Sequence, residues 1–164
     1  MRTDRRHSDV RLLLRILDEA YQKKAWHGPN LKGSLRGVTA GQAVWKPSPH
    51  RHSIWELVRH TTYWKYAVRR RLLGEKRGTF PIGGSNWFHV PSPPNETAWK
   101  RDVALLAEVH SSLRDAVSKM TTRDLQNAPR GSKVTNETII YGIAFHDVYH
   151  SGQIQLLKQL QKKG

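Results

Sequence analysis

The sequence predicts an all-α protein, a four-helix bundle with long crossover loops. Four segments carry apolar residues at intervals of three and four, which is the spacing of one helix face. No segment shows the sustained polar and apolar alternation that is typical of a half-buried strand. The stretches between the segments are rich in Gly and Pro and longer than the usual hairpin between helices, so we expect at least one to cross an end of the bundle.

The first two helices are expected at about residues 9–25 and 53–73. The second begins with Ser53 and Glu56, an S-x-x-E capping box in which each side chain accepts a hydrogen bond from a backbone N–H that the helix leaves free. Gly74 follows the last apolar position and is a typical helix stop. The apolar stripe of the first helix contains Val10, Leu14, Leu17 and Tyr21.

The third and fourth helices are expected at about residues 96–120 and 136–162. Either Thr135 or Asn136 can cap the fourth helix, and its C-terminal lysines suit the negative end of the helix dipole. A length of 164 residues favours one domain, which we expect to span residues 1–164. The apolar stripe of the third helix contains Trp99, Val103, Leu106, His110, Leu113 and Val117.

The composition excludes several classes of protein. The absence of cysteine rules out disulfides, cysteine-ligated zinc and a cysteine nucleophile. No run of about 18 apolar residues exists, so we expect no membrane span, and the first residues lack the apolar middle of a secretory signal. We therefore expect a cytoplasmic protein without a membrane partner.

The chain is strongly basic, with 28 Lys and Arg against 13 Asp and Glu and a formal net charge of +15. Such a surplus attracts polyanions such as nucleic acid. The basic residues are spread along the chain, however, from RTDRR at the start through residues 69–71 and 76–77 to the last lysines. No aromatic and basic motif of an RNA-binding fold is present. Solvated basic faces are therefore favoured, and nucleic-acid binding stays as the alternative.

Polar residues interrupt the apolar stripe of the fourth helix. Steps of three and four lead from Ile143 through His146, His150 and Gln153 to Leu157. Burying a polar group without a partner costs about 1–3 kcal/mol in proteins, so three in succession need a partner. Residues four apart on a helix have Cβ atoms roughly 5–6 Å apart, so both imidazoles can reach one metal ion at about 2.0–2.1 Å.

A third metal ligand is expected from another helix. His60 lies at the edge of the apolar stripe of the second helix, so His60, His146 and His150 form one candidate site. His110 competes as a ligand or neighbour, although a lone core histidine more often only hydrogen-bonds a neighbour. The same hydrogen-bonded arrangement is the alternative for the whole triad, because an H-x-x-x-H pair alone is a weak motif. The other histidines fall in expected loops or at the start of the chain: His7, His27, His50, His52 and His89.

Two polar side chains stand one helical turn from the candidate ligands. Gln153 follows His150 and can orient it, or pack against a loop. Glu56 precedes His60 and could hold its free ring N–H, but the capping box competes for the same carboxylate and is favoured.

Two further features lie near the candidate site. Asp147 points about 100° away from His146 on the helix and is expected to be a surface or interhelix charge rather than a ligand. Trp87, in the long loop before the third helix, can wall the site, and ordinary loop packing is the alternative.

The residues around these histidines resemble a known family. Residues 146–160, HDVYHSGQIQLLKQL, are similar to the C-terminal helix signature H-x-x-x-H-x-G-Q-I of the DinB/YfiT-like metalloprotein superfamily. Residues 53–75, SIWELVRHTTYWKYAVRRRLLGE, resemble the second helix of the family, whose single His precedes an aromatic residue by four positions. Residues 25–43, AWHGPNLKGSLRGVTAGQA, resemble the loop that follows the first helix in many members. The resemblance covers most of the chain.

The resemblance implies a four-helix bundle, often a homodimer, that binds a divalent metal through three histidines. One comes from the second helix and two from the fourth, which in this chain are His60, His146 and His150. The metal in relatives is commonly zinc or nickel. Characterised relatives include transferases and isomerases that use small cellular thiols, and a metal-dependent hydrolase.

These properties lead to two functional hypotheses. In the first, the protein is a metal-dependent hydrolase or small-thiol-dependent S-transferase acting on a small molecule, and no catalytic side chain is assigned because a water or thiol on the metal reacts. A thiol would have to be external, since the chain has no cysteine. In the second, the protein is a metal-stabilised bundle without catalytic activity that acts as a binding or stress-response protein.

Overall fold

The computed structural model describes residues 8–78 and 80–162, so the basic run at the start, His7 and Lys163 lie outside the described residues. Within these ranges the chain forms seven helices and no strand. None of these helices is long and apolar enough to cross a membrane. Four long helices build the molecule: α1 (Ser8–Tyr21), α4 (Ile54–Leu72), α5 (Glu96–Ser118) and α7 (Asn136–Gln161).

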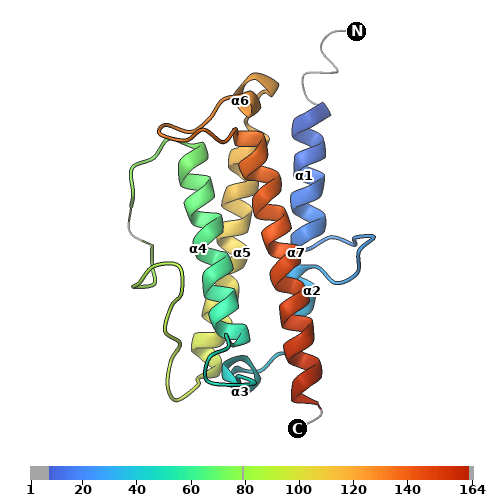
Figure 1. The fold of residues 1–164 in the computed structure, drawn as a ribbon, viewed down its shortest axis with the longest axis vertical. Coiled ribbons are helices and arrows are strands. Elements are labelled where there is room, and N and C mark those ends of the chain that lie inside the picture. The colour runs from blue at the N-terminus through green and yellow to red at the C-terminus, as the bar shows by residue number, and fades with distance from the viewer. Residues whose placement is uncertain (1–7, 79, 163–164) are drawn as a thin grey trace.

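The long helices form a four-helix bundle, as predicted. α1 packs against α5 and α7, and α4 packs against the same two helices. Figure 1 shows that α4 and α5 run in the same direction, so the segment between them returns along the whole length of the bundle. That segment, residues 73–95, is the long crossover that the Gly- and Pro-rich composition indicates.

The boundaries follow local signals. The capping box of Ser53 and Glu56 is present at the start of α4, and Gly74 follows the helix with φ +65°, a conformation that glycine adopts without strain. Thr135 caps α7. The expected end of the first helix at residue 25 is wrong by four residues, since α1 ends at Tyr21. Just beyond it, the backbone N–H groups of Gln22 and Lys23 both donate to the Asp18 carbonyl, and the Lys23 carbonyl accepts from Nδ2 of Asn30.

Three short helices within the connections were not predicted. They are α2 (Leu31–Ser34), α3 (Ala40–Val44) and α6 (Thr122–Gln126). Each is too short for apolar periodicity to show, but each follows a side chain that accepts from a backbone N–H of its first turn: Asn30, Thr39 and Thr121.

The core consists of two apolar clusters separated by a polar layer. One cluster contains Ile54 and Val58 of α4 with Ile154 of α7, and the other contains Val68 of α4 with Ile140 of α7. Between them, at the middle of the bundle, the helices bury polar side chains instead of leucines. The polar layer contains His60, Thr61, Lys65, His110, Asp147 and His150, with the partly buried His146 among them.

Candidate metal centre

Three histidines converge in the polar layer. His60 of α4 and His150 of α7 each place Nε2 3.1 Å from Nε2 of His146. One ligand atom of each ring lies within 4.8 Å of those of the other two, close enough for the three to hold one metal ion. This histidine cluster forms because α4 and α7 pack side by side and α7 presents both of its imidazoles, one turn apart, to the same face.

Hydrogen bonds at the far side of two rings fix their tautomers. His60 donates from Nδ1 to the backbone carbonyl of Asn86 at 2.8 Å, and His150 donates from Nδ1 to Oε1 of Gln153 at 2.6 Å. A neutral imidazole that carries its proton on Nδ1 has a lone pair on Nε2. Both rings therefore direct lone pairs towards His146.

The third ring cannot satisfy both of these lone pairs. If His146 carries its proton on Nε2, it can donate to one neighbour only, and its buried Nδ1 has no hydrogen-bond partner among the described residues. Three ring nitrogens facing one another need a group that accepts several lone pairs, and imidazole nitrogen is a common ligand of divalent transition metals. The donor set thus fits a metal ion.

The protonation state of the cluster also fits. Burial lowers the pKa of His60 to about 4, with the neighbouring His150 acting in the same direction. Burial, with the charges of the other two histidines, lowers the pKa of His146 to about 3, and burial lowers that of His150 as well. All three rings are therefore neutral near pH 7, the form that binds metal.

The crossover loop holds the outer side of the cluster. Arg59 donates to the carbonyl of His89, and Trp64 donates from Nε1 to Oδ1 of Asn86 at 2.9 Å. Asn86 has φ 60°, a left-handed conformation that asparagine tolerates better than most residues. These contacts keep the carbonyl of Asn86 against His60, which orients the ring.

Trp87 covers the cluster. Its indole lies parallel to His60, with ring centroids 4.0 Å apart, and meets His150 edge-on at 6.5 Å. His52 stacks on the opposite face of the indole at 3.4 Å. The loop thus places an aromatic wall between the histidine cluster and solvent on one side.

Two cavities lie beside the cluster. The first, of about 460 Å³, is lined by His60 and His146 together with apolar side chains of α4 and α7, and by Arg71 and Asn86. The second, of about 570 Å³, is lined by Gln153, by leucines of α4 and α7, and by five residues of the α3–α4 loop: Pro47, Ser48, His50, Arg51 and His52. A small molecule can therefore reach the imidazoles from the first cavity.

Two of the candidate neighbours lie elsewhere. Glu56 is taken up by Ser53 and by Lys46, which donates to it at 2.8 Å, so it does not orient His60. His110 stacks on Tyr21 with ring centroids 3.9 Å apart and lies within 3.1 Å of the ammonium of Lys65, and it is not among the three histidines whose ligand atoms converge. Glu56 thus caps α4, the role that the sequence favours, and His110 is a core histidine in contact with Lys65 and Tyr21.

Asp147 is an interhelix charge, and the surface alternative is wrong. Its side chain is 0% exposed and pairs with Lys65, which is also 0% exposed. Lys65 lies 3.1 Å from Nδ1 of His110 and above the ring of Tyr21. This lysine node (Tyr21, Lys65, His110 and Asp147) takes one residue from each long helix.

Three contributors were missed in the sequence. Asn86 and His52 lie in the crossover and α3–α4 loops, where no periodicity indicates which residue faces the bundle. Lys65 had a signal, since it continues the four-residue step from Thr61 into the buried face of α4.

Comparison with known proteins agrees with this site. No curated protein and no solved structure matches the chain significantly. The model of the DinB superfamily matches residues 25–154, which include all of α4 and most of α7 and hence the three histidines. Because this match covers well over half of the chain, the protein belongs to the DinB superfamily.

Proposed function

We propose that His60, His146 and His150 bind one divalent metal ion, zinc or nickel, and that the protein is a metal-dependent enzyme, a hydrolase or small-thiol-dependent S-transferase. The observation that carries this proposal is the convergence of three neutral imidazoles, one ligand atom of each lying within 4.8 Å of those of the other two, beside a cavity. A closed structural site normally has four protein ligands, whereas three leave room for a reactant.

The residues around the cluster have separable roles in this proposal. When bound, the ion supplies Lewis acidity, which lowers the pKa of a water or thiol and polarises a carbonyl group. Asn86 and Gln153 hold the Nδ1 protons of His60 and His150, so that Nε2 stays available. Trp87 excludes water from one side of the cluster.

The cavity beside His60 and His146 supports a small-molecule substrate. Its walls include Trp64, Ile139 and Ile143, which favour an apolar group next to the imidazoles. The chain has no cysteine, so a thiol that takes part in transfer comes from a second small molecule.

Metal content tests the ligand set. We expect about one zinc or nickel ion per chain after loading and gel filtration, and almost none in His146→Ala, because two imidazoles alone bind weakly. His27→Ala is the matched control, since His27 is exposed. An unchanged metal content in His146→Ala would contradict the proposed site.

Activity separates an enzyme from a metal-stabilised bundle. The metal-loaded protein, the chelated protein and His146→Ala are compared in a screen of ester and amide hydrolysis, and of thiol addition to electrophiles. We expect turnover that requires both the metal and His146. Stoichiometric metal binding without turnover of any substrate class would favour the non-catalytic bundle.

A further inference from the structure

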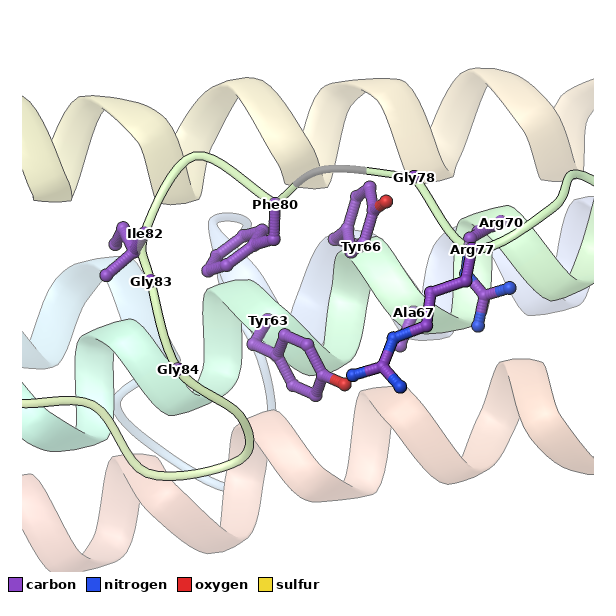
Figure 2. A pocket seen from close by; sticks show the side chains of 10 residues that line it. All are labelled: Tyr63, Tyr66, Ala67, Arg70, Arg77, Gly78, Phe80, Ile82, Gly83 and Gly84. Carbon is purple, nitrogen blue, oxygen red and sulfur yellow. The ribbon is translucent and has the colours of Figure 1, made fainter.

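A separate cavity of about 160 Å³ lies between α4 and the crossover loop. None of the three histidines lines it. Figure 2 shows its arrangement: Arg70 and Arg77 lie at one end, Phe80 and Ile82 at the other, and Tyr63 and Tyr66 between them. The cavity therefore has a cationic end and an aromatic end.

The cationic end is uncompensated. Nε of Arg70 is buried and has no hydrogen-bond partner among the described residues, and its Nη1 makes one long bond, 3.3 Å, to the carbonyl of Glu75. The Glu75 carboxylate is taken by Arg69 at 2.9 Å. No acidic residue lines the cavity. A buried guanidinium N–H without an acceptor is costly, and a carboxylate is the partner that its geometry fits best.

The aromatic end is built from rings that already contact one another. Phe80 packs against Tyr63 and Tyr66 with ring centroids 5.5 and 5.4 Å away. A Cβ at Gly78 would lie 3.1 Å from the hydroxyl of Tyr66, so glycine lets the loop close over that ring.

We propose that this cavity binds a one-ring aromatic carboxylate, with the ring among Tyr63, Tyr66 and Phe80 and the carboxylate at Arg70 and Arg77. The volume fits this size, since a cavity of about 150 Å³ in another protein holds one benzene ring. The proposal does not depend on the metal centre, because the two sites share no lining residue.

Calorimetric titration of the chelated protein with benzoate tests the proposal, because chelation prevents benzoate from binding at a metal. We expect saturable binding, with acetate, benzyl alcohol and inorganic phosphate each binding roughly tenfold more weakly or worse. Equal binding of acetate or phosphate would overturn the aromatic part of the proposal, and equal binding of benzyl alcohol would overturn the carboxylate part. No saturable binding of benzoate up to about 10 mM would overturn it entirely.

Two variants locate the binding site. Arg77→Gln changes an exposed loop residue and should weaken benzoate binding roughly tenfold or more, because it removes a charged partner. Arg123→Gln removes the same charge from an exposed position on α6 and should change binding by no more than about twofold. Equal effects of the two substitutions would mean that benzoate responds only to the net charge, and the proposal would fail.

Discussion

The histidine cluster and the lysine node lie in the same polar layer, but they differ in how their buried polar groups are compensated. Both consist of side chains that a helix bundle normally replaces by leucine. In the lysine node, the ammonium of Lys65 supplies the positive charge that Asp147 and His110 face. In the histidine cluster, the three rings are neutral and supply only lone pairs.

The difference separates a polar cluster that contains its own charge pair from one whose rings supply only lone pairs. Within the lysine node, Nε2 of His110 and Oδ1 of Asp147 have no hydrogen-bond partner among the described residues. Asp147 follows His146 directly in α7, so the same turn of this helix contributes one residue to each cluster. Burial raises the pKa of Asp147 to about 6, and the charge of Lys65 acts against this rise. The node therefore contains its own cation, whereas the histidine cluster would take the proposed metal ion from solution.

Breaking the node should have the largest effect. Lys65→Met leaves the carboxylate of Asp147 buried without a counter-charge, and we expect the free energy of unfolding to fall by about 3–5 kcal/mol. Urea denaturation measures this loss. Lys119→Met is the matched control, because Lys119 pairs with Asp115 on the surface, where both side chains are more than half exposed.

A second variant refines this test. Lys65→Met combined with Asp147→Leu removes both charges and should regain much of the lost stability. If Lys65→Met were as stable as Lys119→Met, the buried Asp147 would not need the charge of Lys65. The contrast between a charge-paired lysine node and a neutral histidine cluster would then be wrong.

Metal should stabilise the protein through the histidine cluster alone. At a free metal concentration of about one hundred times Kd, binding adds about 2.7 kcal/mol to the free energy of unfolding. We expect this increment in the wild type and in His110→Gln, because His110 belongs to the lysine node, and its loss in His146→Ala. Thermal melts with and without metal measure this increment. An increment that is lost in His110→Gln and kept in His146→Ala would mean that the metal binds at the lysine node and not at the histidine cluster.

Most of the histidine cluster was accessible from the sequence because helical spacing alone aligns His146 with His150 and interrupts an apolar stripe. The four long helices were accessible for the same reason. The contribution of Asn86 was not, since it depends on how a loop crosses a distant helix. The burial of Asp147 could not be predicted either, because its position on the helical wheel of α7 is compatible both with solvent exposure and with a pair to Lys65.

The orientation of His150 should have a smaller effect than the loss of a ligand. Gln153→Ala removes the acceptor of the Nδ1 proton, and we expect the affinity for metal to fall about 10- to 100-fold without loss of stoichiometry. Competition with a chromophoric chelator measures the affinity. Gln159→Ala, at an exposed position of the same helix, should leave it unchanged. Equal affinities of the two variants would mean that Gln153 only packs.

The smallest effect is expected at Asp18 of α1, a buried carboxylate that accepts from Arg114 of α5 at 2.7 Å and pairs with Lys23 at 2.9 Å. Burial raises the pKa of Asp18, but the hydrogen bonds from Arg114 and Lys23 outweigh it, and the pKa lies below its usual range. Both cations reach solvent, so Asp18→Asn should cost only about 1–2 kcal/mol at pH 7.

This contribution to stability has a definite pH dependence. A carboxylate whose pKa is lower in the folded than in the unfolded chain stabilises the fold fully above the unfolded value, about 3.9, and loses that effect as the pH falls through the folded value. The difference in free energy of unfolding between wild type and Asp18→Asn should therefore be constant from pH 7 to about pH 5 and shrink below about pH 4. Urea denaturation at several pH values measures it. A difference that stays constant down to about pH 2 would mean that Asp18 acts through the geometry of its hydrogen bonds and not through its charge.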